Sequence, residues 1–232
     1  MEENCIAFKL NYCNGLEIDD SQDEHIGFRG LCSKNVMKAN VLHVKRGWCS
    51  HEENLCKQCL DGKFSREELD EKWRRVAEDD SANDAGFCNE SFTLRYWYAE
   101  AGWNSDDTPR RIANKDLAGH LCVLTTVIPF THESTRFVFA MFIVKDVCDG
   151  GYNRADYVLA DDYWRLEFRP NEVLRINFFD VYPSSSKFWG QGLFRYFDDG
   201  LAVKFLKRAV EVKRGTPEED FAKEFLKQYP YK

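Results

Sequence analysis

RFVFAMFIVKDVC, residues 136–148, has the composition of a buried β-strand. It consists largely of aromatic and β-branched residues, which are enriched in strands. The preceding stretch HLCVLTTVIP, residues 120–129, has the same character, and polar and turn-forming residues separate the two. Together these stretches predict two strands of one sheet.

Other segments of the same kind surround this pair. Four of them read as strands: FTLRYWYAE (92–100), DYVLA (156–160), WRLEFR (164–169) and LRINFFDVY (174–182). Two helices follow, DDGLAVKFLKRAVEVK (198–213) and PEEDFAKEFLKQY (217–229), the second with Thr216 as its N-cap. The pattern predicts an α+β fold, in which about five or six mostly antiparallel strands form a small curled or mixed β-barrel flanked by helices.

The composition changes near residue 86. Most aromatic residues lie after it, and EDDSANDAG (78–86) has the composition of a linker. Before it, CIAFKLNY (5–12) reads as a strand, Ser33 caps a helix through KNVMKAN, and Ser65 with Glu68 forms a capping box that opens SREELDEKWRRVAE. We therefore expect a cysteine-rich module over 1–86 and a barrel domain over 87–232.

Composition and charge limit the class of protein. Hydrophobic residues are 44% and charged residues 31% of the chain, and no apolar run approaches the ~20 residues that span a bilayer. The acidic N-terminus has no basic and apolar leader, so we expect a cytoplasmic protein without a membrane partner. A net charge of −7 argues against general nucleic-acid binding through phosphates, although residues 186–214 are locally basic.

Six of the nine cysteines lie in the first 59 residues. Cys56 and Cys59 have the spacing at which two thiolates take adjacent corners of a tetrahedral zinc site. Cys32 and Cys49 complete the set, because both flank loop-like sequence, and His51 is a rival ligand. A module poor in aromatic residues has little core of its own, and a structural zinc contributes on the order of 10 kcal/mol to the folding of such modules. The sequence predicts a structural zinc ion at these four cysteines.

Two alternatives remain for this cluster. The thiols could be free and buried, or the CxxC pair could be redox-active. A redox pair is expected at the start of a helix after a strand, whereas Cys56 reads as loop. The scattered Cys88, Cys122 and Cys148 are expected to be core thiols.

Four stretches of the second part form a known pattern: RYWYAEAGWNSDDTPRRI (95–112), LCVLTTVIPFTHESTRFVFAMFIV (121–144), INFFDVYP (176–183) and FWGQGLFRYFDD (188–199). Their order resembles the PUA-like superfamily, nearest to its EVE, YTH and ASCH branch. The closest versions carry an N-terminal cysteine module and occur beside or within modification-dependent restriction systems. The resemblance covers roughly residues 88–212.

This resemblance implies a compact barrel whose pocket accepts a modified or flipped nucleobase. Such a pocket needs flat side chains, each worth about 1 to 3 kcal/mol per stacked base, and amide or backbone groups that read the base edge. Trp97, Tyr98, Trp103, Asn104 and Ser105 supply these groups around the end of one predicted strand. About half of the aromatic residues in alternating strands face the core, so Trp103 and Asn104, which lie in a loop, are the preferred candidates.

A second wall and phosphate contacts are expected nearby. Phe188 and Trp189 adjoin glycines that permit close approach of a ligand to the backbone. Lys187 and Arg195 could meet a phosphate, and the Arg110–Arg111 pair could touch one or be solvated.

Catalytic patterns are weak. Glu211 and Lys213 with Asp198 or Asp199 superficially fit a nuclease, but they lie in sequence that reads as helix. Cys122 beside His120 and His132 reads as an inert core thiol. We therefore expect a recognition module for a modified base in DNA, the specificity part of a restriction or defence system whose nuclease is another domain or subunit. The alternatives are a small ASCH-like hydrolase acting on RNA or nucleosides, and a protein-interaction module.

Overall fold

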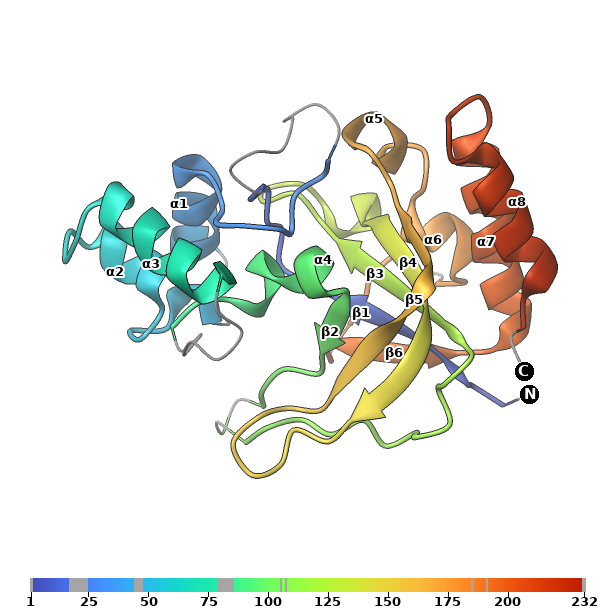
Figure 1. Ribbon diagram of the computed structural model, residues 1–232, viewed down its shortest axis with the longest axis horizontal. Coiled ribbons are helices and arrows are strands. Elements are labelled where there is room, and N and C mark those ends of the chain that lie inside the picture. The colour runs from blue at the N-terminus through green and yellow to red at the C-terminus, as the bar shows by residue number, and fades with distance from the viewer. Residues whose placement is uncertain are drawn as a thin grey trace. The chain divides into compact units, whose positions relative to one another are not determined.

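A computed structural model describes residues 2–16, 25–43, 48–78, 86–104, 106, 108–184, 186–190 and 192–230. The fold is α+β, as predicted: a mixed, strongly curled six-stranded half-barrel accompanied, in these residues, by eight helices (Figure 1). The chain forms two compact units. The larger comprises residues 1–10, 97–127 and 132–232, and the smaller comprises 11–96 and 128–131.

The sheet of the larger unit has the strand order β2-β5-β4-β3-β1-β6. The first strand is parallel to β3, and the other neighbours are antiparallel. The strands are β1 (Cys5–Lys9), β2 (Tyr98–Glu100), β3 (Leu121–Thr126), β4 (Phe137–Cys148), β5 (Tyr157–Glu167) and β6 (Phe194–Phe197). The pairing of β1 with both β3 and β6 places the N-terminal segment inside the sheet of the larger unit, so the expected division at residue 86 differs from the observed one.

The two central strands are buried on both faces, which explains their continuous apolar sequence. Every residue of β3 and the first eight of β4 are buried. The register shifts at Leu124/Thr125 and at two points in β4 where it pairs with β5. Such irregularities bend strands and increase their twist, and they allow the sheet to curl.

The larger unit has four helices: α5 (Pro170–Val173) and α6 (Phe178–Val181) lie between β5 and β6 in the chain, and α7 (Asp199–Lys213) and α8 (Glu219–Gln228) follow β6. The last two confirm the predicted C-terminal helices and lie side by side (Figure 1). Asp198 caps α7 by accepting from the Leu201 N–H. The expected N-cap of α8, Thr216, lies two residues early, and its hydroxyl accepts a 3.3 Å hydrogen bond from the N–H of Glu218.

One predicted strand of the larger unit is wrong. LRINFFDVY contains the helix α6 because Asn177 caps it, its side chain accepting a 2.8 Å hydrogen bond from the Phe179 N–H. The apolar residues that suggested a strand are core residues of a short helix: Phe178 and Phe179 are both buried.

The smaller unit is helical in its described residues. It contains α1 (Lys34–His43), α2 (Leu55–Leu60), α3 (Arg66–Glu78) and α4 (Thr93–Tyr96), with short 3-10 turns at Trp48–Ser50 and Asn89–Ser91. The predicted capping box of α3 is confirmed: the Ser65 N–H donates to Glu68 and the Glu68 N–H donates to the Ser65 hydroxyl. Leu69, Trp73 and Ala77 form the buried stripe of that helix.

An aromatic core holds the smaller unit. The Trp73 ring stacks on Phe92 at 5.9 Å, and Phe92 stacks on Tyr96 at 5.9 Å. Phe92 and Tyr96 come from FTLRYWYAE, which was predicted to be one strand but forms α4 and then β2, with Trp97 at a φ of +51° between them. The module therefore has more core than its sequence up to residue 86 suggests.

Among the described residues, the longest helices fall short of the length and apolar character required to cross a bilayer.

Candidate functional site

A loop after β2 presents the ring of Trp103, which is 43% exposed. A bridge between Trp103 and Pro109 closes the loop, and the Asn104 N–H donates to the Thr108 carbonyl at 2.9 Å. Arg110 lies at the end of this loop, and its Nε donates a hydrogen bond to the Trp103 carbonyl at 3.0 Å. The backbone around this exposed ring is therefore held by several hydrogen bonds.

The polar groups of the same loop are partly engaged with each other. Asn104 Nδ2 donates to the Thr108 hydroxyl at 3.0 Å, and that hydroxyl donates to Asp106 at 2.6 Å. The amide nitrogen expected to read a base edge thus has a partner within its loop. Ser105, the remaining predicted member, lies outside the described residues.

The loop before β6 adjoins the Trp103 loop. Gly102 has a φ of +71°, and a Cβ there would lie 2.5 Å from Leu193 Cδ1. This second loop carries Phe188, which is 54% exposed. Lys187 adopts a φ of +46°, and its ammonium group lies 3.5 Å from Asp180. Trp103 and Phe188, two exposed rings that were predicted to bind a base, therefore belong to loops that are in contact.

Trp189 is a core residue and does not line a ligand pocket, contrary to the prediction. Its side chain is fully buried, and its Nε1–H donates to the Gly192 carbonyl at 3.2 Å. The Phe178 ring lies 5.0 Å away, and the guanidinium of Arg136 lies 5.2 Å from the ring centre. A base could not stack on this ring in the observed arrangement.

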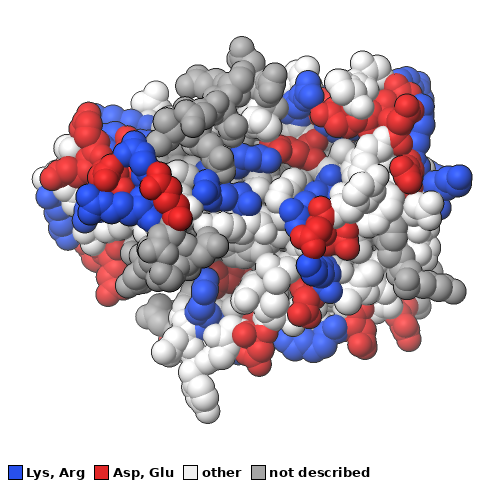
Figure 2. All heavy atoms as spheres, in the orientation of Figure 1, with Lys and Arg blue, Asp and Glu red and all other residues white. Residues whose placement is uncertain are grey.

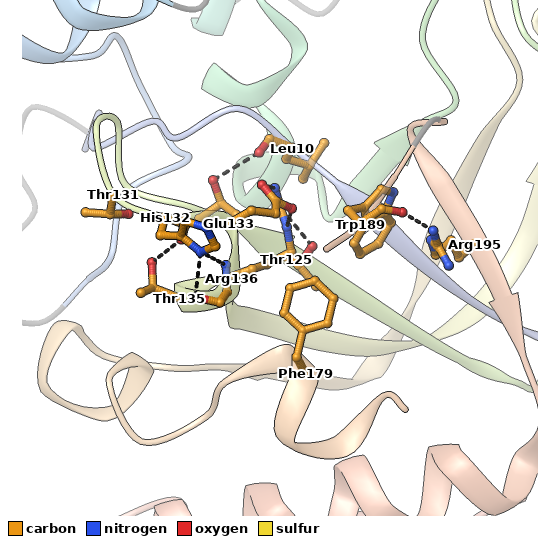
Figure 3. A network of polar contacts seen from close by, with 12 residues as sticks. Leu10, Thr125, Thr131, His132, Glu133, Thr135, Arg136, Phe179, Trp189 and Arg195 are labelled. Atoms are coloured by element: carbon orange, nitrogen blue, oxygen red, sulfur yellow. Dashed lines mark hydrogen bonds and ion pairs between the residues drawn. The ribbon is translucent and has the colours of Figure 1, made fainter. Parts of the chain in front are cut away.

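A buried ion pair supports Trp189 (Figure 3). Arg136 is 1% exposed and binds both carboxylate oxygens of Glu133, at 2.6 and 3.1 Å. It also donates to the Thr125 hydroxyl at 3.2 Å. Because this guanidinium is so fully bonded, its role is to hold the strands and the Trp189 segment together.

A second cation lies beside the same tryptophan. Arg195 donates to the Trp189 carbonyl, and its guanidinium lies 5.7 Å from that ring and 5.8 Å from the Tyr182 ring. Its Nε is buried and has no hydrogen-bond partner among the described residues. Burial lowers the pKa of the nearby Lys9, and Arg136 and Arg195 lower it further against the opposing effect of Glu133. Cations therefore outnumber anions beneath the second loop.

The first two predicted base-binding residues face the sheet. Trp97 is half-buried, with its ring edge against Phe142 at 6.3 Å and the Arg165 guanidinium 5.7 Å from it. Tyr98 is buried against Tyr157. Of the described residues expected to bind a base, Trp103 and Phe188 are the two with strongly exposed rings.

Among the described residues, the four predicted zinc ligands of the smaller unit do not form a group of three or more whose ligand atoms lie within 4.8 Å of one another, although several of these thiols affect one another's pKa. A hydrogen bond with Cys13 and burial raise the pKa of Cys32 well above its usual value, with further contributions from the Cys88 and Cys56 thiols. Burial raises the pKa of Cys56 to about 12, and the Cys13 thiol adds to this effect. Cys49 is half-buried beside Cys56 and Cys13. Sequence reasoning missed Cys13 and Cys88, which stand alone in the sequence.

The fourth predicted ligand has different surroundings. Cys59 is half-buried in a pocket that Lys34, Phe64 and Arg66 also line. The rival ligand His51 is exposed, and its ring stacks on Trp48 at 4.8 Å. Cys56 lies in the first turn of α2, not in a loop as expected. Its raised pKa is nevertheless the opposite of the lowered pKa that activates redox cysteines.

A separate group in the larger unit could hold a metal ion. The ligand atoms of Cys5, His120 and Asp199 all lie within 4.8 Å of one another. The strand register explains this meeting. Ile6 pairs with Cys122 in β3, which brings Cys5 next to the residues before that strand, and Cys5 itself pairs with Phe197, two residues before Asp199.

Asp199 Oδ1 is the centre of this group. Cys5 Sγ donates to it at 3.4 Å, His120 Nδ1 lies 3.0 Å away, and the Tyr229 hydroxyl also donates to it. Burial acts to raise the pKa of Asp199, but the three hydrogen bonds outweigh burial and the pKa is lowered. Burial raises the pKa of Cys5 to about 12, so this thiol is protonated near neutral pH when no cation is bound.

The carboxylates and lysine of the superficial nuclease pattern do not converge. Asp198 caps the start of α7, while Lys213 at its end is buried against Glu172 at 2.7 Å. A helix of this length separates its ends by roughly 20 Å. The pattern therefore belongs to helix capping and a buried ion pair.

No protein-family model, curated protein or solved structure matches this chain in the comparisons made with each of them.

Proposed function

We propose that the larger unit is a PUA-like domain that binds nucleic acid by stacking an exposed base against Trp103, with Phe188 as a second contact. The observation that carries this proposal is the pair of exposed aromatic rings on two touching loops. Aromatic rings stack on bases with about 1 to 3 kcal/mol per base, so two rings are enough to position one or two bases.

The hydrogen bonds at Trp103 and Asn104 favour this role. A ring on a mobile loop loses conformational entropy when it binds, and the loss reduces affinity. Here the Trp103–Pro109 bridge and the Arg110 hydrogen bond fix the backbone before a ligand arrives. The exposed ring is therefore already placed for contact.

Local positive charge supplies the phosphate contacts. Lys187 precedes Phe188 and is about half exposed, and Arg110 bonds the Trp103 carbonyl. Lys9 and Arg195 add positive charge beneath the second loop. Figure 2 shows acidic and basic side chains interspersed over the face drawn there, in keeping with the net charge of −7. Binding is therefore proposed to be local to the aromatic site.

The curled mixed half-barrel supports the PUA-like assignment at the level of architecture. Within that assignment, the ligand is DNA containing a modified base, and the protein is the recognition part of a restriction or defence system that works with a separate nuclease domain or subunit. A base that leaves the duplex costs a few kcal/mol of unstacking, which a stacking site must offset.

The test is equilibrium binding to labelled oligonucleotides by fluorescence polarisation. Duplexes and single strands containing plain, methylated and hydroxymethylated bases are compared at one fixed salt concentration, because salt alone changes phosphate-driven affinity by orders of magnitude. Preference for a modified duplex over its plain counterpart supports the reader. Equal binding to all duplexes rejects modification reading, and no binding to any oligonucleotide rejects the proposal.

For the smaller unit, we propose that a structural zinc ion is held by thiolates of the buried group that includes Cys32 and Cys56. The support is the hydrogen bond between Cys13 and Cys32 and the effect of the Cys13 thiol on the pKa of Cys49, Cys56 and Cys88. Among the described residues no three of these thiols lie within 4.8 Å of one another, so zinc binding requires them to move closer together. Thiolates are the ligands that structural zinc sites prefer. Cys59 adjoins this group, because its thiol contributes to the raised pKa of Cys56, but it is less buried than Cys56.

A further inference from the structure

We propose that Cys5, His120 and Asp199, with Tyr229 as a fourth donor, form a binding site for a divalent transition metal of the zinc class in the larger unit. This site is independent of the aromatic surface and of the cysteine group in the smaller unit. It rests on the convergence of four different donor atoms on one point.

The separations between these donor atoms are close to those of a tetrahedral site. With zinc bonds of about 2.3 Å to sulfur and 2.0–2.2 Å to nitrogen and oxygen, neighbouring ligand atoms lie roughly 3.4 to 3.6 Å apart. Here Cys5 Sγ lies 3.4 Å from Asp199 Oδ1 and 3.1 Å from Tyr229 Oη, and His120 Nδ1 lies 3.0 Å from Asp199 Oδ1. For Cys5, His120 and Asp199 an outward movement of a few tenths of an ångström makes room for a cation, whereas the Tyr229 hydroxyl, which lies closer to Asp199 Oδ1, must move further.

The hydrogen bonding of the group also points to a cation. One oxygen, Asp199 Oδ1, is in contact with a thiol, an imidazole nitrogen and a phenol hydroxyl. The sulfur, the imidazole nitrogen and the carboxylate oxygen are all donor atoms that zinc-class ions bind. A divalent ion at the centre would accept electron pairs from sulfur, nitrogen and oxygen together.

The charges balance when a metal binds. The Cys5 thiol loses its proton to solvent and the sulfur forms a bond to the metal, while His120 binds through an unprotonated Nδ1 and keeps its proton on Nε2. One thiolate and one carboxylate then neutralise the two positive charges of the ion, and the Tyr229 phenol remains neutral. A neutral assembly suits a site in which the cysteine is fully buried.

The solvent exposure of the group gives an ion a route to the ligands, and the positions of the ligands in the chain show which segments a bound ion would join. Cys5 is fully buried, but the side chains of His120 and Asp199 are 21% and 43% exposed, so solvent reaches one side of the group. The ligands come from β1, the start of β3, the start of α7 and the segment after α8. Cys5 Sγ lies 3.1 Å from the Tyr229 hydroxyl, so β1 and the segment after α8 meet at this group. A bound ion would fasten the first strand to the C-terminal segment.

Cobalt(II) is the probe for the test, because a thiolate ligand gives it a charge-transfer absorption band and tetrahedral coordination gives it intense visible bands. The reduced, chelator-treated full chain is titrated with cobalt(II) and then with zinc(II). The same titrations in a Cys56→Ser chain separate this site from thiols of the smaller unit. We expect one ion per chain that persists in Cys56→Ser and raises the melting temperature.

Matched variants decide the ligands. In the Cys56→Ser chain, His120→Gln and Asp199→Asn should each weaken binding by roughly 100-fold or more, and Cys5→Ser should remove the remaining charge-transfer band. His132→Gln and Cys148→Ser are the controls, because both residues belong to the same unit and neither lies in the group. Circular dichroism verifies folding, and the two partly exposed positions keep the test valid if Cys5→Ser unfolds. If the chain takes up no metal, or if metal uptake is unchanged by His120→Gln and Asp199→Asn, the metal site is rejected. The group is then a hydrogen-bonded network without a metal function.

Discussion

Gly102 and Leu193 approach so closely that a methyl group on Gly102 would lie 2.5 Å from Leu193 Cδ1. The contact joins the loop that carries Trp103 to the loop that carries Phe188. Two loops that are remote in sequence thereby meet, and each carries an exposed ring. The proposed binding function depends on this contact between the loops.

Replacing Trp103 with alanine should reduce affinity for the preferred oligonucleotide by about 1 to 3 kcal/mol, or roughly 5- to 150-fold, because one stacking partner is lost. The melting temperature should change little, since 43% of the side chain is already exposed. Tyr163→Ala is the matched control: this ring is 59% exposed on β5 of the same unit but belongs to neither loop. Equal losses in both variants would contradict a stacking role for Trp103.

A double-mutant cycle tests whether Trp103 and Phe188 contact the same ligand. Residues that share a partner show coupling energies of about 0.5 to 3 kcal/mol, whereas distant independent residues are additive. We expect the loss of affinity in the Trp103→Ala/Phe188→Ala chain to differ from the sum of the single losses by at least about 0.5 kcal/mol. Strict additivity in the polarisation assay would place the two rings in separate contacts.

The central strands were predictable because their continuous apolar sequence indicates burial on both faces of the sheet. β3 and β4 are buried on both faces, so their uninterrupted apolar runs fit no exposed element. The terminal helices were equally clear, since α7 buries an apolar stripe and begins at a capping aspartate. Local composition was misleading where short helices are aromatic: Phe178 and Phe92 have strand propensity, but packing and capping place them in helical turns.

The candidate sites were less predictable because they depend on long-range pairing. No local pattern links Cys5 to Asp199, which meet because β1 is inserted between β3 and β6. In the smaller unit, the CxxC motif directed attention to Cys59, while Cys13 and Cys88, which have no local motif, raise the pKa of Cys32. The exposure of Trp103 was anticipated from its loop, whereas the burial of Trp189 follows from packing against Phe178 and Arg136.

The zinc proposal for the smaller unit predicts different zinc contents when Cys56 and Cys59, both in α2, are replaced. Cys56→Ser should lower the zinc content of the purified chain by about one ion and destabilise the module, because a structural zinc supplies much of the folding free energy of such modules. Cys59→Ser should retain the zinc, since Cys59 is only half-buried and lines a pocket with Lys34, Phe64 and Arg66. Elemental analysis of both variants gives the result. Loss of zinc in Cys59→Ser alone would restore the CxxC pair as the ligand set, and unchanged metal content in both would support free thiols.

Asp156 should make the stability of the larger unit depend on pH in the acid range. Burial acts to raise its pKa, but hydrogen bonds from Lys115 at 2.6 Å, from Arg111 at 2.9 Å and from the backbone N–H groups of Ile112 and Gly150 outweigh burial and lower the pKa to about 2. The Asp156 side chain is 1% exposed, whereas the side chains of Arg111 and Lys115 are 44% and 52% exposed.

The sign follows from the direction of the change. A carboxyl group whose folded-state pKa lies below its ordinary value of 3.8 stabilises the fold fully above that value, and this stabilisation is lost as pH falls through about 2. The difference corresponds to about 2 kcal/mol. Asp156→Asn should therefore lower the free energy of unfolding by about 2 kcal/mol at pH 7, and the gap from the native chain should narrow between about pH 4 and pH 2, as measured by urea denaturation. Asp149→Asn is the control, because Asp149 pairs with the same Arg111 at 3.4 Å but is 78% exposed and should contribute little. A gap for Asp156→Asn that stays constant down to pH 2 would show that its effect comes from packing and not from the carboxylate charge.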